Sequence, residues 1–145
     1  MNTWIIFIWI YAAMIATSYW EAYIEGKNPW ARKQVGWKLK LGKKYSITAY
    51  HFFLFGIAYP LLIFLPLLFI GFSWKIFGIL LSAYASGLVI EDFFWFIADP
   101  YYSLKKFNSK YVYWYPWLKI GRLEIPWLYI LGIGIAVLSW YFLWG

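Results

Sequence analysis

Two adjacent acids, Glu91 and Asp92, interrupt an apolar and aromatic run, "SGLVIEDFFWFIADP", at positions 86–100. A carboxylate in hydrocarbon is costly, so acids in such runs almost always face the protein interior and pair with another group. The single histidine, His51, and a further acid, Glu21, lie in other apolar runs. A buried carboxyl beside an imidazole forms a proton relay, and the same oxygen and nitrogen donors suit Fe, Mn or Zn. We therefore expect Glu21, His51, Glu91 and Asp92 to form a polar cluster that relays protons, holds a metal ion or organises the packing.

The remaining acids have simpler interpretations. Glu25, Asp99 and Glu124 are expected in or near water, where a carboxylate costs little. Asp99 precedes Pro100, and a residue before proline is disfavoured in a helix, so Asp99 is expected to end one. Glu21 is close enough to the same boundary to reach water, and both interpretations remain open for it.

Composition identifies the elements that must position these groups. Of 145 residues, 64% are hydrophobic, 27% aromatic and only 13% charged, which is typical of a membrane protein. Each apolar block reaches the ~20 residues needed to cross the hydrocarbon, and the alternating segments of a β-barrel are missing. We predict an all-α, polytopic protein, a single domain 1–145 with four transmembrane helices at about 3–24, 46–71, 74–98 and 126–144. The first block lacks a basic n-region and a cleavage site, so it is expected to remain as a mature helix.

Basic residues concentrate in two predicted loops, 26–45 and 99–125. The first holds seven of the thirteen lysines and arginines and the second holds five, whereas only Lys75 lies in the opposite turn. The positive-inside rule then places both loops in the cytoplasm and both termini on the extracytoplasmic side of the cell membrane. Attraction to anionic lipid headgroups explains the net charge of +7, so no nucleic-acid partner is expected.

Several chemistries are excluded or disfavoured by residue type. No cysteine is present, which excludes thiol catalysis and thiolate metal sites, and one histidine cannot build a histidine-rich di-iron site. A triad of Ser46 or Ser86 with His51 and Asp92 lacks a nucleophile elbow and is not favoured.

Small residues and prolines predict how the helices pack. Gly78, Ser82 and Ser86 form a small-residue ladder that permits close approach of another helix, and Asp92 lies within ~40° of Gly78 around the helix axis. The fourth helix offers Gly132, Gly134 and Ala136 for a close contact. The second is expected to bend or break at Pro60 and Pro66, with neighbouring groups satisfying the freed carbonyls.

The loops carry their own pattern. Residues 37–41 are expected to be extended because they alternate strictly, and residues 117–126 because two apolar pairs flank Gly121-Arg122. A short helix is expected after Asn28-Pro29, anchored by Trp30.

Four segments carry a resemblance, namely "WEAYIEGKNPWA", "TAYHFF", "IEDFFWFIADPYYSLKKFN" and "VYWYPW". In these the chain is similar to a group of small, uncharacterised prokaryotic multi-pass membrane proteins. The resemblance covers most of the chain and implies no particular activity, cofactor or substrate.

Two functions from different classes remain. The first is a subunit of a larger membrane complex, whose polar cluster organises the bundle or relays protons and whose helices meet other subunits or a second copy. The alternative is a membrane-embedded enzyme, metal-dependent or acting by acid and base, on a lipid or quinone. A proton-coupled transporter is less favoured, because four helices leave one chain little room for alternating access.

Overall fold

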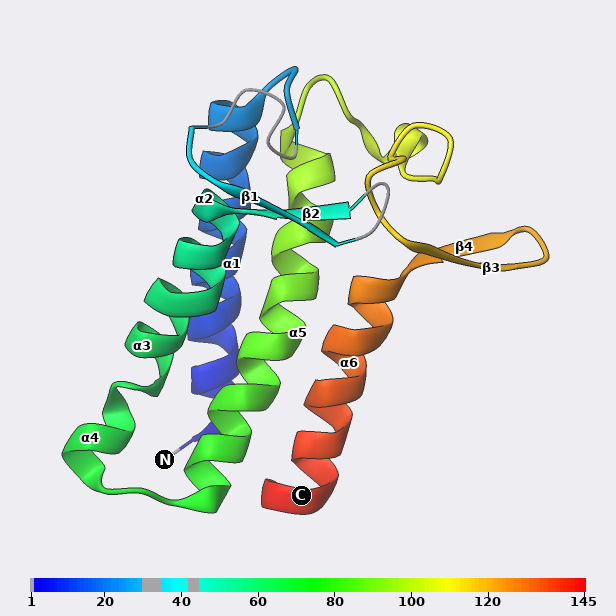
Figure 1. Cartoon of the computed structure of the whole chain (residues 1–145). Helices are drawn as coiled ribbons and strands as arrows, with labels where there is room; N and C mark the ends of the chain where they lie inside the picture. Colours follow the sequence, from blue (N-terminus) through cyan, green and yellow to red (C-terminus); the bar gives the residue numbers. More distant parts are fainter. Residues whose placement is uncertain (1, 30–34, 42–44) are drawn as a thin grey trace.

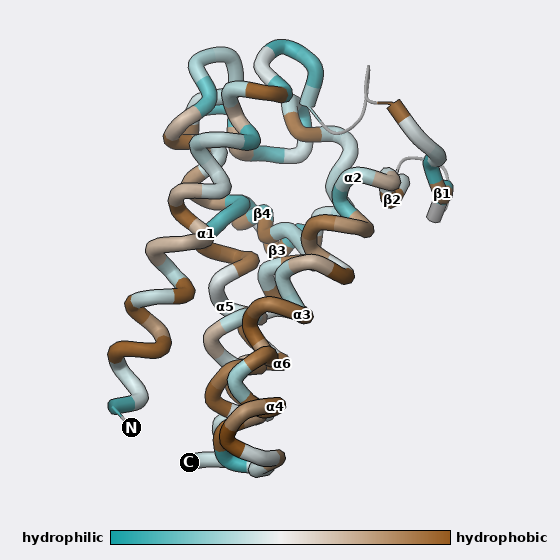
Figure 2. The backbone as a smooth tube through the Cα atoms, turned by 90° about the vertical axis from the view of Figure 1, so that its left-hand side faces the viewer, coloured by the Kyte–Doolittle hydropathy of each residue, from teal (hydrophilic) through white to brown (hydrophobic). Residues whose placement is uncertain are grey.

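The computed structural model describes residues 2–29, 35–41 and 45–145. Four helices in this part of the chain are long and apolar enough to cross a bilayer. They run up and down, so the termini lie together at the end opposite the two long loops (Figure 1). Hydrophobic residues dominate the helices, and hydrophilic residues gather in the loops (Figure 2).

The helix bounds lie close to those expected from the apolar blocks. The first helix is α1 (Thr3–Glu25) and the third is α5 (Trp74–Ala98). The fourth is α6 (Trp127–Ser139), which continues into the π-helical η3 (Trp140–Trp144). The second begins at residue 49 and not at 46, because the preceding residues pair as a strand.

The second helix is interrupted twice. It consists of α2 (Ala49–His51), the π-helical η1 (Phe52–Ala58), α3 (Tyr59–Phe64) and α4 (Pro66–Ile70). The π-helical segment ends just before Pro60, which cannot donate a backbone hydrogen bond. In the π pattern that bond would reach the Phe55 carbonyl, and the Tyr84 hydroxyl donates to it instead. The expected interruption of the helix is confirmed, and for Pro60 a neighbouring side chain satisfies the freed carbonyl as expected.

Two antiparallel hairpins accompany the helices at the loop end. Strands β1 (Lys38–Leu41) and β2 (Tyr45–Thr48) form the first, and β3 (Trp117–Ile120) and β4 (Leu123–Pro126) form the second. Gly121 at φ 60° turns the second hairpin. The extended character expected for residues 37–41 and 117–126 is thus largely confirmed. The second long loop also contains a short 3₁₀ turn, η2 (Leu104–Lys106). The helix expected after Asn28-Pro29 falls mainly on residues 30–34, outside the described residues.

Helix α5 is the centre of the structure, with α1 packed on one flank and α6 on another. Its small residues permit both contacts. Ser82 Oγ donates to the Ala136 carbonyl at 2.9 Å, and Ser139 Oγ donates to the Gly78 carbonyl at 2.9 Å. Ser86 instead lies 2.8 Å from the Tyr11 hydroxyl of α1, so the ladder divides between two neighbours.

Glycines of α6 differ in what they face. A Cβ on Gly132 would lie 2.9 Å from the Ala85 carbonyl oxygen of α5. The close approach of α6 to α5 therefore requires glycine at this position. A Cβ on Gly134 would meet nothing within 4 Å among the described residues. The expectation that Gly134 contributes to close helix packing is therefore wrong, because it lies on a different face of α6.

The 99–116 segment folds onto the loop ends of the helices and completes a second core. From this segment Val112, Trp114 and Tyr115 are buried, and they pack with Ala22 of α1 and with Trp95 and Phe96 of α5. This aromatic layer closes the end of the bundle at which the expected polar residues lie.

Candidate functional site

A cavity of about 380 Å³ lies between η1, α5 and α6 and reaches the end of α1. Its walls are apolar, with two residues from each of three helices among them: Phe52 and Phe55, Leu88 and Val89, Leu131 and Ile135. Its polar lining comes mainly from Glu21, Glu25, His51, Glu91, Asp92, Tyr115 and Tyr129. The cavity is therefore amphipathic, and all four residues expected to form a polar cluster line it.

His51 lies between two oxygen groups. Its Nε2 is 3.2 Å from Glu21 Oε1, and its Nδ1 is 2.6 Å from Thr48 Oγ1. Thr48 also caps α2, because its hydroxyl accepts the backbone N–H of His51 at 3.2 Å. One capping residue thus begins the helix and orients the imidazole that the helix carries.

Glu91 lies beside Glu21 on the neighbouring helix. The Glu91 side chain is within hydrogen-bonding range of Glu21 and interacts electrostatically with Glu25 and Asp92. The residue is only 6% exposed, and its Oε1 has no hydrogen-bond partner within the described residues. A buried carboxyl oxygen without a partner is costly unless something else reaches it.

Asp92 has different neighbours from those expected. The Tyr115 hydroxyl donates to Asp92 Oδ1, and the Tyr129 hydroxyl donates to Oδ2 at 2.6 Å. Burial and the Asp92 carboxylate raise the pKa of Tyr115 well above its ordinary value, so this hydroxyl remains a donor. Asp92 therefore joins α5 to the 99–116 segment and to α6.

Glu25 belongs to the site although the sequence suggested an interfacial role. It is 8% exposed, and one ligand atom from each of Glu21, Glu25 and His51 lies within 4.8 Å of the others. The signal was present in the sequence, since Glu21 and Glu25 are one helical turn apart and share a face of α1. Tyr115 in the loop and Tyr129 at the start of α6 were missed, because aromatic residues near the ends of membrane spans usually form an interfacial belt.

Asp99 and Glu124 have structural roles. Asp99 Oδ1 accepts the backbone N–H groups of Tyr101 and Tyr102 at 2.6 and 2.9 Å, which ends α5 as expected from Pro100. Asp99 is only 2% exposed, however, so the expectation that it lies in or near water is wrong, and burial raises its pKa.

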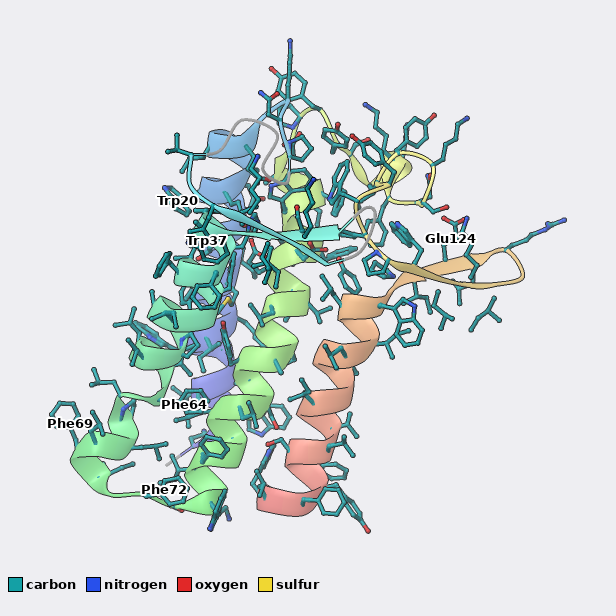
Figure 3. The ribbon with its side chains drawn as sticks, in the orientation of Figure 1. Trp20, Trp37, Phe64, Phe69, Phe72 and Glu124 are labelled. Atoms are coloured by element: carbon teal, nitrogen blue, oxygen red, sulfur yellow. The ribbon has the colours of Figure 1, made fainter. Side chains whose placement is uncertain are left out.

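Glu124 lies on β4, away from the cavity (Figure 3). It accepts the Ser109 backbone N–H at 2.6 Å and pairs with Lys119 at 3.1 Å, and these contacts lower its pKa.

The triad of Ser86, His51 and Asp92 is not assembled in the described part of the chain. The His51 ring nitrogens face Glu21 and Thr48, Asp92 accepts from two tyrosines, and Ser86 bonds to Tyr11 in the α1–α5 contact.

The structure is that of a small, mostly helical protein with four helices long and apolar enough to cross a membrane, which is compatible with a multi-pass membrane protein. No family model, curated protein or solved structure matches the chain. This agrees with a resemblance to a group that has no characterised family.

Proposed function

We propose that this is an integral protein of the cell membrane, with the two long loops in the cytoplasm and both termini outside. The distribution of lysine and arginine supports this orientation, since twelve of the thirteen lie in those loops and one lies in the opposite turn. In this orientation the polar part of the cavity is near the cytoplasmic leaflet, where the basic loops meet anionic headgroups.

The function that the geometry supports best is that of a membrane-embedded enzyme acting on a lipid or a quinone. The observation that carries this proposal is the amphipathic lining of the cavity, with carboxylates and an imidazole beside aliphatic and aromatic walls. Ligand sites are generally apolar cavities of this size class with a few convergent polar groups. The apolar part of the ligand lies between η1 and α6, and its polar group lies against Glu21 and His51.

His51 and Glu21 supply acid and base chemistry in this proposal. Their 3.2 Å separation lets a proton pass between carboxyl and imidazole, and Thr48 fixes the ring orientation through Nδ1. The buried aromatic layer around Trp114 and Tyr115 excludes water from the polar groups.

Filling the cavity tests this function. A Cβ on Gly56 would lie 3.7 Å from the Phe52 ring, an ordinary contact, so Gly56→Leu places side-chain volume in the cavity at little local cost. Gly134→Leu is the matched control, because a Cβ on Gly134 meets nothing within 4 Å in the described part of the chain. Lipids and quinones that co-purify in detergent are extracted and quantified by mass spectrometry.

We expect a bound amphiphile in the native protein and in Gly134→Leu, with at least a ~10-fold lower occupancy in Gly56→Leu. Its identity separates the two sources, an acyl lipid or a quinone. A native protein without a stoichiometric amphiphile, or equal occupancy in both variants, would contradict the proposal.

A second candidate function is proton relay within a larger membrane complex. It is favoured by the position of His51, whose two ring nitrogens connect the Thr48 hydroxyl to the Glu21 carboxyl. A relay through this path requires proton flux in liposomes to fall in Glu21→Gln and to persist in Glu124→Gln. Purification from the native membrane in mild detergent tests the subunit role, which fails if the protein migrates alone as a monomer.

A further inference from the structure

The buried group Glu21, Glu25 and His51 has the composition of a metal-binding site. Two carboxylates and one imidazole, with no sulfur, suit Mn²⁺, Fe²⁺ and Zn²⁺. The carboxylates are separated by one turn of α1, and the imidazole comes from α2. Two helices thus bring the three ligand atoms within 4.8 Å of one another.

The spacing of these atoms is close to that around a bound ion. Ligands held ~2.1 Å from a metal at angles of about 90–110° are roughly 3.0–3.4 Å apart. The distance of 3.2 Å between Glu21 Oε1 and His51 Nε2 already lies in this range. The third ligand atom lies within 4.8 Å of the other two, so ion binding requires a carboxylate to move closer.

Thr48 supplies the outer contact that metal-binding histidines usually have. A histidine that binds through Nε2 donates its Nδ1 hydrogen to an acceptor, which fixes the tautomer and the ring orientation. Thr48 Oγ1 lies 2.6 Å from Nδ1, and Thr48 is itself 2% exposed. The Nε2 lone pair then points to the side of the ring where Glu21 lies.

Glu91 provides an independent observation that points to a ligand. Its buried Oε1 lines the same cavity and has no hydrogen-bond partner within the described residues. The C-terminus of α1 adds partial negative charge to the site, because Glu25 is the last residue of this helix. A cation is favoured there for this reason as well. A bound cation satisfies Glu91 and offsets the repulsion between neighbouring carboxylates.

We propose that Glu21, Glu25 and His51 bind one divalent transition-metal ion, with Glu91 as an additional oxygen ligand. Compared with the cluster expected from the sequence, this set gains Glu25 and loses Asp92, whose oxygens are held by Tyr115 and Tyr129. The inference goes beyond the proposed function, because a bound ion takes the Glu21 and His51 atoms that exchange a proton in its absence. These two residues then act as ligands, while the amphiphile binds the cavity in either case.

Metal content of the purified full-length protein tests the site. The protein is treated with a chelator, and Mn²⁺, Zn²⁺ and Co²⁺ are titrated separately, with stoichiometry measured by elemental analysis and affinity by calorimetry. Glu25→Gln keeps the shape of the side chain and removes the charged ligand. Glu124→Gln is the matched control, since it removes a carboxylate that lies outside the cavity.

We expect one ion per chain in the native protein and in Glu124→Gln, with an affinity at least ~10-fold weaker in Glu25→Gln. Thr48→Val should weaken binding in the same direction, whereas Thr48→Ser keeps the hydroxyl and should bind as the native protein does. With Co²⁺, the visible absorption spectrum should change in His51→Gln. Helical circular dichroism of each variant distinguishes loss of a ligand from loss of the fold, and Glu25→Asp keeps the charge if Glu25→Gln does not fold.

Absence of a stoichiometric ion with all three metals, or equal affinity in folded Glu25→Gln and native protein, overturns the metal site. Failure of the metal site and failure of amphiphile binding are separable. Gly56→Leu should lose the amphiphile and keep the ion, while Glu25→Gln should lose the ion and keep the apolar walls of the cavity.

Discussion

At the scale of single residues, the carboxylates that share one cavity have different partners and therefore different roles. Glu21 lies against His51, Glu91 has an oxygen without a partner among the described residues, and Asp92 accepts two tyrosine hydroxyls. Those partners separate groups that can take a ligand from one that connects structural elements.

The tyrosines that hold Asp92 should contribute to stability. Tyr115→Phe or Tyr129→Phe removes one donor and leaves a carboxyl oxygen without its partner, which costs about 1–3 kcal/mol. Denaturant unfolding in detergent measures the change. Tyr141→Phe, at an exposed tyrosine of η3, should be neutral. Unchanged stability of both Tyr115→Phe and Tyr129→Phe would show that hydrogen bonds from these hydroxyls to Asp92 do not stabilise the fold.

Asp99 should make stability depend on pH in a specific direction. Burial raises its pKa, so the folded state holds the proton more tightly than the unfolded state does. Its contribution is therefore most favourable below the ordinary value of 3.8 and is lost as pH rises through the higher folded value. Asp99→Asn keeps an oxygen acceptor for Tyr101 and Tyr102 and removes the ionisation.

The variant should gain stability relative to the native protein as pH increases from about 4 to 7. Thermal unfolding at several pH values measures this difference. A native protein that becomes relatively more stable over that interval would show that the Asp99 carboxylate is favoured by the fold.

At the scale of elements, the close contact between α5 and α6 depends on which residues lie between them. Ser82 and Ser139 reach backbone carbonyls of the opposite helix, and Gly132 lies against the α5 backbone. Packing of this kind stabilises helix pairs where lipid removes the usual hydrophobic driving force.

Gly132→Ala and Gly134→Ala should have opposite effects. At Gly132 the new methyl group would lie 2.7 Å from Val89 Cγ2 and 2.9 Å from a carbonyl oxygen, so overpacking should cost about 1–3 kcal/mol. At Gly134 the methyl group meets nothing within 4 Å among the described residues, and alanine should be neutral or stabilise the helix by up to ~1 kcal/mol. Thermal unfolding of both variants in one detergent provides the comparison. Equal stability of the pair would contradict the close contact.

At the scale of the whole molecule, the four helices place both long loops at one end and both termini at the other (Figure 1). The charge distribution then predicts which end faces the cytoplasm. Labelling of single introduced cysteines can test this prediction, because the native chain contains no cysteine.

Single cysteines report the orientation directly. Lys75 and Lys105 are both exposed and lie at opposite ends of the bundle. In intact cells, a membrane-impermeant maleimide should label Lys75→Cys and should leave Lys105→Cys unlabelled until the membrane is permeabilised. The reverse pattern would invert the proposed topology and place the polar part of the cavity near the outer leaflet.

The sequence by itself determined the number of long helices, their approximate bounds, the extended loop segments and the break in the second helix. These features follow from local properties, namely the length of an apolar block, the alternation of side chains and the missing N–H of proline. It also placed Glu21, His51, Glu91 and Asp92 at similar depth along their helices.

Only the tertiary structure decided which of these groups meet. It brought Glu25 to Glu21 and His51, gave Asp92 its two tyrosine partners, and separated Gly132 from Gly134. Helical periodicity fixes the relative angles of residues on one helix but not its rotation against its neighbours. That rotation is set by the packing of complete side chains, and it determines whether a buried acid meets a tyrosine, an imidazole or another acid.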